Sequence, residues 1–275
     1  MIQDIGPHRL YNQYERRTQP QPEDVVFAME NGKVLMKDST SFPRVGELGM
    51  ALPYVYLFAV DETRFFLLRE PAQYPPEWEM VEVRSLRGNP NVEKHIIFAA
   101  MTAKHLSDWY RDSRFCGRCG GGMVHSEKER AMCCPVCGCT VYPRIMPAVI
   151  VGVIHGEELL VTRYRVGYRH NALVAGFTEI GETAEETVAR EVMEETGLRV
   201  KNIRYYKSQP WGIASDLLLG YYCEVDGDTA ICMDEGELRL AQWVRREEIQ
   251  LQPDDFSLTN EMMLMFKNGT IRAGQ

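Results

Sequence analysis

An acidic stretch between residues 176 and 198 offers the residue types and spacing best suited to chemistry. Within it, Glu191, Glu194 and Glu195 stand at positions i, i+3 and i+4, so on a helix they would share one face. Arg190 is the one basic residue in the stretch. Carboxylates grouped without compensating lysines suit a hard divalent cation such as Mg²⁺ or Mn²⁺. The pattern therefore predicts a cation-binding face, and the alternative is an ordinary solvated acidic helix.

The helix that must carry these glutamates has recognisable ends. Thr183 is followed three residues later by Glu186, which is a capping box. Val188 and Val192 then recur at helical spacing, and Gly197 supplies a left-handed stop. We therefore predict one helix over residues 184–196.

Two pairs of cysteines upstream offer a second kind of chemistry. Fourteen residues separate the two CxxC pairs, and each pair is followed by a glycine that lets the backbone turn tightly and donate hydrogen bonds to sulfur. Four thiolates at this spacing suit a closed, tetrahedral Zn²⁺ site of the structural kind. The predicted ligands are Cys116, Cys119, Cys134 and Cys137.

Other readings of this cysteine-rich segment remain open. Cys133 and Cys139 could each replace a neighbour as ligand, although only the pair at 134 and 137 keeps the CPxCG knuckle. An ordinary cysteine-rich loop is a second alternative. A redox role is disfavoured because no thioredoxin-like βαβ pattern surrounds the pairs. His125 lies between the pairs, and we expect an exposed loop histidine there rather than a fifth ligand.

Composition bounds the class of protein. The 275 residues are 45% apolar and 25% charged, which predicts a globular chain of about two domains. A net charge of −8 argues against a general nucleic-acid or polyanion surface, although an acidic protein can still bind phosphates that metal ions bridge, and no DNA partner is expected. No apolar run approaches the ~20 residues of a membrane span, and the N-terminus lacks a signal-peptide core. We therefore expect a cytoplasmic protein whose eight cysteines are thiols or metal ligands.

The remaining pattern predicts the elements around these motifs. An irregular lead-in over 1–24 precedes two hairpins (25–36 and 54–68), a strand over 80–86 and a helix over 91–110, which together make a small α+β domain at 1–112. The cysteine ribbon occupies 113–141. A third part, 142–275, should contain strands at 148–154, 157–163, 172–175, 203–209, 217–225 and 238–244, and a closing helix at 257–267.

The acidic stretch resembles a known family signature. Its spacing, Gly176-x5-Glu182-x7-Arg190-Glu191-Val192-x-Glu194-Glu195-x-Gly197-Leu198, matches the Nudix box at every defined position. Nudix hydrolases cleave a nucleoside diphosphate linked to another moiety and use divalent cations. The resemblance implies an α+β fold in which a Nudix α/β/α sandwich with a mixed sheet follows the zinc ribbon and the N-terminal domain.

The flanking residues narrow this resemblance. The ribbon, then VYPRIMPAVI, AGFTEIGE and SQPW at 208–211, look like the zinc-ribbon NAD(H) pyrophosphatase branch over about residues 105–245. Members of that branch split NADH or NAD⁺ into nicotinamide mononucleotide and AMP, and some remove NAD caps from RNA 5′ ends. They form homodimers whose sites draw on both protomers. A dinucleotide substrate, and a homodimer, are what the resemblance implies here.

The resemblance also implies roles for single residues. The catalytic residues would be Arg190, which orients a box glutamate, and the metal-binding glutamates at 191, 194 and 195, with Glu182 in a supporting role near the helix start. Which glutamate is the general base stays open. Glu235 is close enough to Glu237 in sequence to be confused with it. The implied cation ligands are the Ala175 carbonyl, Glu191, Glu194, Glu195 and Glu237.

Implied substrate contacts lie outside the helix. Tyr142 and Phe177 match aromatic positions that sandwich a nucleotide base; the alternative is that both are core aromatics. Where the branch signature continues as SQPWPFPxS, this chain reads SQPWGIASD, so two prolines and a phenylalanine are missing. The dinucleotide preferred is therefore left open. The remaining implied contacts are Gln209, Trp211, Ser215 and Asp216 of the signature, and Arg84 of the N-terminal domain.

Two further functions compete with NAD(H) hydrolysis. One keeps the chemistry and changes the substrate to ADP-ribose, FAD or a dinucleoside polyphosphate. The other is a nucleotide-sensing zinc-ribbon regulator without turnover. The intact set of box glutamates argues against the sensor, because a protein that only binds nucleotides has no need to keep all of them.

Overall fold

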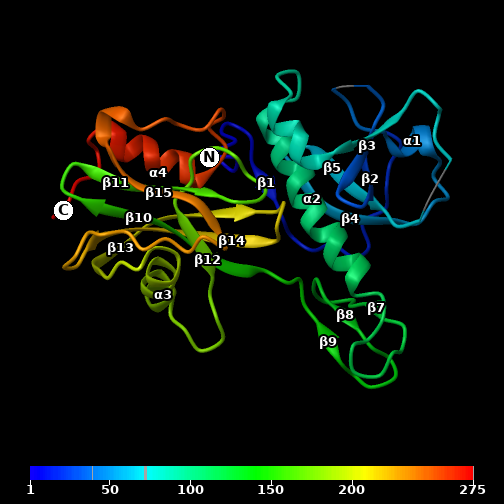
Figure 1. Cartoon of the computed structure of the whole chain (residues 1–275). Coiled ribbons are helices and arrows are strands. Elements are labelled where there is room, and N and C mark those ends of the chain that lie inside the picture. The colour runs from blue at the N-terminus through cyan, green and yellow to red at the C-terminus, as the bar shows by residue number, and fades with distance from the viewer. Residues whose placement is uncertain (39, 71–72, 275) are drawn as a thin grey trace. The chain divides into compact units, whose positions relative to one another are not determined.

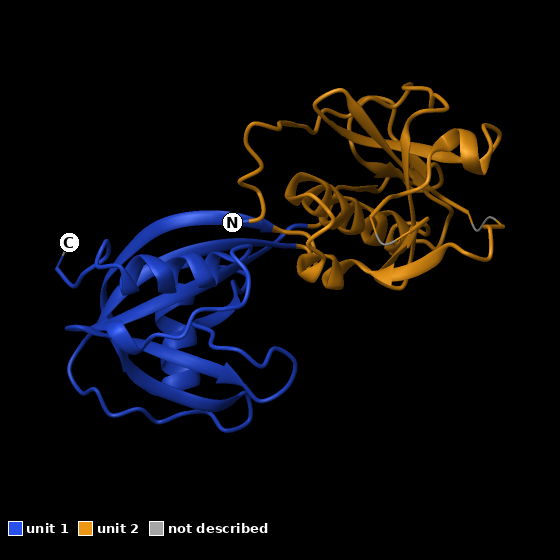
Figure 2. Ribbon diagram, turned by 90° about the horizontal axis from the view of Figure 1, so that it is seen from above, with its two compact units in different colours: residues 1, 145–210, 216–275 blue, residues 2–144, 211–215 orange. Residues whose placement is uncertain are grey.

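The computed structural model describes residues 1–38, 40–70 and 73–274 (Figure 1). The chain forms two compact units (Figure 2). Unit 1 contains residue 1 with 145–210 and 216–275, and unit 2 contains 2–144 with 211–215. The cysteine ribbon and the N-terminal part thus fall in the same unit, together with a five-residue loop from much later in the chain.

A mixed sheet forms the centre of unit 1. Its strands run in the order β13-β14-β10-β11-β15, with β12 paired to β10. β10 and β14 are parallel, whereas β11 and β12 pair with β10 in antiparallel fashion. The bounds are β10 Met146–His155, β11 Glu158–Tyr164, β12 Val174–Phe177, β13 Val200–Trp211, β14 Asp216–Val225 and β15 Leu238–Arg245.

Helix α3 (Ala184–Thr196) covers one face of this sheet. Because side chains alternate along a strand, every second residue of β10 points toward it. Val149, Val151 and Val153 accordingly share a buried cluster with Val188 and Val192 of the helix, and all five are fully buried. The helix stripe predicted from the sequence is the surface that packs on the sheet.

Helix α4 (Leu258–Lys267) covers the opposite face (Figure 1). The hydroxyl of Tyr222 in β14 donates to the carbonyl of Met262 at 2.7 Å. Gly220 lies close beneath the same helix, and a β-carbon there would come 3.0 Å from Met262 Sδ. The expected α/β/α sandwich with a mixed sheet is confirmed.

Unit 2 contains a second sheet, in the order β1-β4-β5-β2-β3-β6. Both predicted hairpins are present, and β2 pairs in parallel with β5. The long helix α2 (Lys94–Asp112) contacts β2 and β4. The strands are β1 Leu10–Tyr11, β2 Val25–Glu30, β3 Lys33–Met36, β4 Tyr54–Val60, β5 Thr63–Leu68 and β6 Glu79–Glu82, and α1 spans Val45–Leu48.

Two expectations for this part were wrong. The strand predicted over 80–86 ends at Glu82, and a 3₁₀ helix follows over Val83–Gly88. Its buried residues, Val83 and Leu86, are three apart, which places them on one side of a 3₁₀ helix. Residues 1–24 are not wholly irregular, because β1 pairs with β4. A strand of two residues is too short to show an alternating pattern.

The ribbon carries a small sheet of its own, formed by β7 (Val124–His125), β8 (Met132–Cys133) and β9 (Thr140–Val141). A short 3₁₀ helix, Arg246–Glu248, follows β15 in unit 1. None of the helices in the described ranges combines the length and the apolar character that a membrane span requires.

Candidate active site

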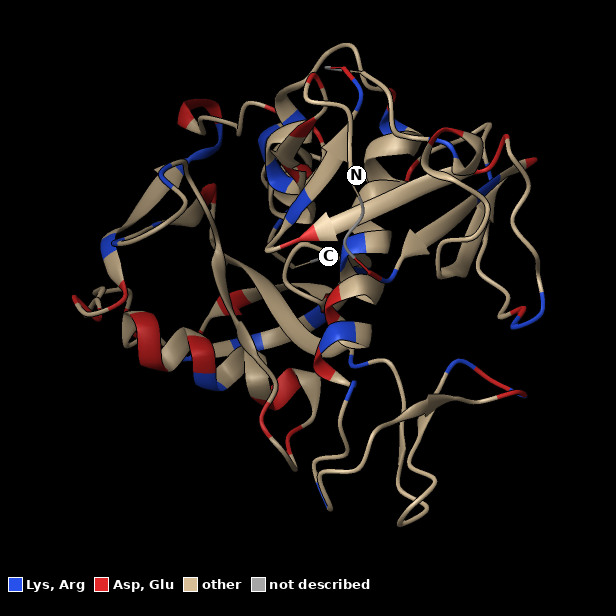
Figure 3. Cartoon of the chain, turned by 90° about the vertical axis from the view of Figure 1, so that its right-hand side faces the viewer, with Lys and Arg blue, Asp and Glu red and all other residues tan. Residues whose placement is uncertain are grey.

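Local capping places the acidic helix as the sequence predicted. The Thr183 hydroxyl accepts from the Glu186 amide at 3.2 Å, and the Glu186 carboxylate accepts from the Thr183 amide at 2.8 Å. Gly197 ends the helix with φ +71°. Acidic residues in the first turn complement the positive end of the helix dipole, and Figure 3 shows acidic positions recurring along α3.

Arg190 organises the exposed face of this helix. Its Nε donates to Glu182 Oε1 at 2.6 Å, and its Nη1 donates to Glu191 at 2.8 Å and Glu194 at 2.9 Å. Its Nη2 donates to the Phe177 carbonyl at 2.9 Å. Hydrogen bonds from Arg190 hold the pKa of Glu182 at about 2, and the carboxylates raise the pKa of Arg190 itself. One guanidinium thus fixes three carboxylates and a strand carbonyl.

Glu195 faces the interior of the unit and is 2% exposed. Neither carboxylate oxygen has a hydrogen-bond partner in the described structure. Burial, followed by the charges of Glu191 and Glu237, raises the pKa of Glu195 to about 8. The Ala175 amide opposes this rise without reaching full hydrogen-bond geometry with either oxygen. A buried carboxylate left without partners is costly unless a cation compensates it.

Glu191 is accommodated by a glycine on the neighbouring strand. Gly176 in β12 is held opposite Val149 of β10. A β-carbon at position 176 would lie 1.9 Å from Cδ of Glu191. Burial raises the pKa of Glu191, while Arg190 opposes that rise. The first residue of the box therefore provides the space that the Glu191 carboxylate fills.

These carboxylates form a donor set that fits a hard divalent cation. The charge of Glu237 raises the pKa of both Glu191 and Glu195, so all three carboxylates contribute to one negative field. Because the charge of Glu237 acts on both residues, we keep Glu237 as the candidate ligand, and the choice between it and Glu235 stays a prediction. Oxygen ligands of this kind are what Mg²⁺ and Mn²⁺ prefer.

Two neighbours of the site were not predicted from the sequence. Burial and the charges of Glu195, Glu191 and Glu237 raise the pKa of Tyr164 in β11. Asp234 adds to the negative field around Glu195, and its amide donates to the Glu195 carbonyl at 2.9 Å. Tyr164 and Asp234 lie outside the box in sequence, and only the folded chain brings them near Glu195. The spacing of residues within the box therefore could not predict them.

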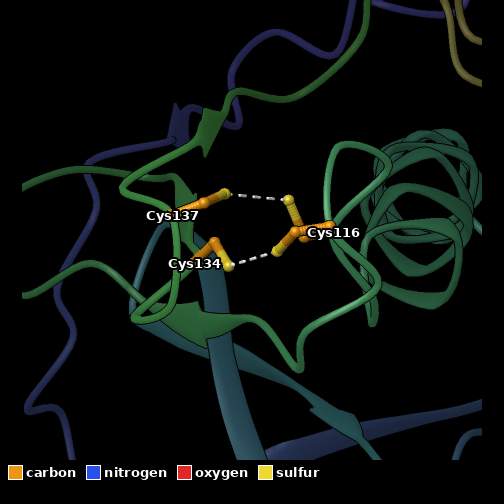
Figure 4. A group of neighbouring side chains, drawn as sticks. Cys116, Cys134 and Cys137 are labelled. Carbon is orange, nitrogen blue, oxygen red and sulfur yellow. Dashed lines mark hydrogen bonds between the residues drawn. The ribbon is translucent and has the colours of Figure 1, made fainter.

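The four predicted zinc ligands meet in unit 2 (Figure 4). All four sulfur atoms lie within 4.8 Å of one another. Cys116 and Cys137 are 3.6 Å apart at sulfur, and Cys119 and Cys134 are 3.5 Å apart; both distances are too long for a disulfide. Backbone N–H groups of Arg118 and Cys119 lower the pKa of the Cys116 thiol to about 6. These features fit a structural Zn²⁺ site.

The open readings of the ribbon can now be decided. Cys133 and Cys139 lie outside the four-sulfur group, so the pair at 134 and 137 completes it. The expectation for His125 was partly wrong. It is not a ligand, but it is half-buried against the Tyr110 ring at 5.1 Å, and burial lowers its pKa to about 4. The sequence does not indicate that this histidine, in β7, would be half-buried.

The two predicted base-stacking aromatics are both exposed. Phe177 in unit 1 is 51% exposed and directly follows Gly176. Tyr142 in unit 2 is 56% exposed, and its hydroxyl donates to Glu129 at 2.9 Å. Neither ring is a core aromatic, so the alternative reading does not hold for them.

Gln209 is placed differently from the expected substrate contact. Its side chain is fully buried. Its Nε2 donates to the Phe256 carbonyl at 2.8 Å, and its Oε1 accepts from the Leu258 amide at 2.7 Å. Both ends of the amide thus bind the backbone where α4 begins, which is a structural task. Asp216 is also buried, and burial raises its pKa to about 6.

The loop that departs from the branch signature packs within unit 2. A β-carbon on Gly212 would lie 2.2 Å from the Met101 carbonyl of α2, so neither proline nor any side chain fits there. Lys104 of α2 donates to the Ile213 carbonyl at 2.9 Å. Arg84 lines an open pocket of about 530 Å³ together with Lys104 and Ile213. The structure therefore brings Arg84 and the altered loop together.

Two other predicted contacts belong to this loop. The Arg87 guanidinium lies 5.1 Å from the centre of the Trp211 ring, a cation–π distance. Ser215 has φ +67°, so it turns the chain back toward β14 in a conformation unusual for a serine.

Comparison with known proteins agrees with this geometry. A sequence model described as the NUDIX domain matches residues 144–263, and one described as the NADH pyrophosphatase zinc ribbon domain matches residues 111–142. The chain is 35% identical over 207 residues to the NAD-capped RNA hydrolase NudC of Enterobacter sp. (strain 638), covering 70% of this chain and 79% of that protein. It is 37% identical over 188 residues to the protein of that name from Escherichia fergusonii, covering 67% and 72%.

Solved structures support the fold. A NUDIX hydrolase from Nitrosomonas europaea superposes with a TM-score of 0.50 at 21% identity, over 56% of this chain and 90% of that one. At this identity the likeness concerns the fold alone and carries no information about substrate.

Proposed function

Since this chain belongs to the Nudix hydrolases, in the group that carries an NADH pyrophosphatase zinc ribbon, we propose that it hydrolyses the pyrophosphate bond of NAD(H). The products are nicotinamide mononucleotide and AMP. The observation that carries this proposal is the buried, unpartnered carboxylate of Glu195 beside Glu191 and Glu237, because such a group needs a cation and a diphosphate brings its cations with it.

We assign the following roles to the residues of the site. Glu191, Glu195 and Glu237, with the Ala175 carbonyl, would hold Mg²⁺ or Mn²⁺. Bound divalent cations neutralise diphosphate charge and increase the acidity of water. Arg190 contacts no substrate in this proposal; it keeps the box glutamates in place. Glutamates held in place in this way keep the reacting groups aligned, which lowers the entropic part of the activation barrier.

Proton transfer needs a group that solvent can reach. Among the box glutamates at positions 191, 194 and 195, Glu194 has the most accessible side chain, at 59%. We assign it the proton of the attacking water, directly or through a second water. The water oxygen attacks one phosphorus, the bridging P–O bond breaks, and the bridging oxygen leaves with the other phosphate.

The substrate class rests on the relatives and on the exposed aromatics. The two relatives are named for hydrolysis of NAD-capped RNA, so we extend the proposal to NAD caps on RNA 5′ ends. Phe177 of unit 1 and Tyr142 of unit 2 each present an exposed ring, and a ring of this kind can stack on a flat base. As in the branch it resembles, we propose that the protein acts as a homodimer, which light scattering of the purified protein would test. We also propose a cytoplasmic location.

The deciding experiment is a substrate panel. Purified full-length protein is incubated with Mg²⁺ or Mn²⁺ and NADH, NAD⁺, ADP-ribose, FAD, a dinucleoside polyphosphate or NAD-capped RNA, and the products are separated chromatographically. Glu195→Gln is the control, expected to abolish turnover with fold and zinc content unchanged. Nicotinamide mononucleotide and AMP as main products support the proposal. Faster turnover of another nucleotide, or tight binding without turnover, would replace it with the other hydrolase or the sensor.

A further inference from the structure

Two histidines and a glutamate form a second cluster of potential metal ligands, within unit 2. His8 comes from the segment before β1, while Glu93 and His95 stand at the start of α2. One ligand atom from each lies within 4.8 Å of the others. The two imidazole rings stack with their centres 3.7 Å apart and their planes at 24°. Chain segments 87 residues apart in sequence thus bring a mixed nitrogen and oxygen donor set together.

A fourth residue fixes the orientation of His8. Its Nδ1 lies 2.7 Å from Asp61 Oδ2, in the turn between β4 and β5. The same carboxylate accepts from the Arg9 amide at 2.9 Å. A carboxylate that accepts from one imidazole nitrogen leaves the other nitrogen with a free lone pair. This carboxylate–histidine arrangement is the one that accompanies histidine ligands of metal ions.

The close stacking of the His8 and His95 rings bears on their protonation. Two rings this close cannot both be protonated without strong repulsion. A pair of neutral imidazoles has lone pairs available, and Glu93 Oε2 lies 3.2 Å from His95 Nδ1. A cation at the edge of the stacked pair, where the in-plane lone pairs lie, could accept a nitrogen from each ring and an oxygen from the carboxylate.

We propose that His8, His95 and Glu93 bind a divalent transition-metal ion, with Zn²⁺ as the ion of choice, at a site separate from the ribbon and from the acidic helix. Imidazole nitrogen with one carboxylate suits zinc, whereas the glutamates of α3 offer only oxygen. Asp61 orients His8 from outside the ligand set.

The site is accessible to an incoming ion. The side chain of Glu93 is 74% exposed and that of His8 is 35% exposed, whereas His95 is 14% exposed. The better-buried His95 therefore provides the fixed ligand, and Glu93 can close over the ion from solvent. A bound ion would tie the N-terminal segment to α2, and binding to the folded state alone would stabilise it by mass action.

Zinc content of the full-length protein tests the proposal. Wild type and variants are dialysed against micromolar free Zn²⁺ with millimolar Mg²⁺ present to occupy the glutamates of α3, and zinc per chain is measured. Wild type should hold about two zinc ions and His95→Ala about one, because the ribbon keeps its own. His170→Ala, which removes an exposed histidine in unit 1, should match wild type. Equal zinc in wild type and His95→Ala would overturn the site.

A second variant covers the case in which His95→Ala does not fold. Glu93→Gln removes an exposed ligand without disturbing the core, and zinc affinity at the second site should fall by ~10–100-fold. Calorimetric titration of protein already loaded with ribbon zinc measures this affinity. An unchanged titration curve in Glu93→Gln, or no heat of binding in wild type, contradicts the proposal.

Discussion

Gly176 and Glu191 pack so closely that a single methyl group cannot be placed between them. The hypothetical β-carbon of residue 176 and Cδ of Glu191 would be 1.9 Å apart. Strand β12 is fixed by its pairing with β10, and Glu191 is held by Arg190. Since the strand backbone is held by its pairing, any side chain at position 176 would have to push the Glu191 carboxylate out of its place.

Gly176→Ala should therefore displace the Glu191 carboxylate. We expect activity with divalent cation to fall by ~10²-fold, the loss typical of a catalytic group misplaced by about 1 Å, with the circular dichroism spectrum unchanged. Gly88→Ala is the matched control, because a β-carbon there meets nothing within 4 Å. Steady-state kinetics over a range of Mg²⁺ concentrations measures the effect. Wild-type activity in Gly176→Ala would show that Glu191 is not needed where it lies.

Arg190→Lys keeps the positive charge and removes the planar guanidinium, whose three nitrogen atoms donate in different directions. A lysine cannot donate at once to Glu182, Glu191, Glu194 and a strand carbonyl, because its three donors radiate from one atom. We expect activity to fall by ~10–100-fold, with a higher Mg²⁺ concentration needed for half-maximal rate. Arg199→Lys, at an exposed arginine just past the helix, should behave as wild type. If both variants retain full activity, charge alone explains the role of Arg190.

Cys134→Ser should remove the ribbon zinc, because Cys134 belongs to the four-sulfur group. Zinc content measured after exhaustive dialysis should fall by about one ion per chain, and unit 2 should become more sensitive to protease. Cys133→Ser is an adjacent control with the same chemical change and should keep the metal. The reverse result would mean that the knuckle uses Cys133.

Asp216→Asn should stabilise the protein in a pH-dependent manner. Burial raises the folded-state pKa of Asp216 from 3.8 to about 6. The ionised form is therefore disfavoured by folding: the cost is absent below about pH 4, grows as pH rises, and is complete above about pH 6. At about 1.4 kcal/mol per pKa unit, the difference of about 2 corresponds to at most about 3 kcal/mol.

Urea unfolding at pH 8 and pH 4 checks this expectation. Asp216→Asn should increase the free energy of unfolding at pH 8 and leave it nearly unchanged at pH 4. Asp226→Asn, which alters a half-exposed residue paired with Lys201, should have little effect at either pH. A destabilised Asp216→Asn at pH 8 would show that the ionised carboxylate has a partner of its own.

The sequence predicted best those features that depend on local spacing. Helix α3 begins and ends where Thr183 and Gly197 placed it, because caps are short-range chemistry. The four cysteines predicted as zinc ligands lie together for the same reason, because their spacing is local. The sandwich followed from the Nudix resemblance, and the strands of unit 1 from runs of buried valine and leucine.

What the sequence could not give depends on contacts between distant residues. Tyr164 and Asp234 reach Glu195 through the pairing of strands and the turn before β15. Gln209 was expected to contact the substrate, yet its side-chain amide accepts a hydrogen bond from the Leu258 backbone at the start of α4. The cluster of His8 and His95 was likewise invisible, since nothing local relates residues that far apart.

The loop 211–215 has a consequence for dissecting the protein. It folds with unit 2, although the strands on either side belong to unit 1, and Gly212 lies against the backbone of α2. A cut between Arg144 and Ile145 would therefore leave residues 211–215 on the C-terminal fragment and remove them from the α2 residues that they contact. The C-terminal part should therefore not be expressed as an independent fragment. A chimera that exchanges the N-terminal parts of two related proteins must exchange residues 211–215 as well.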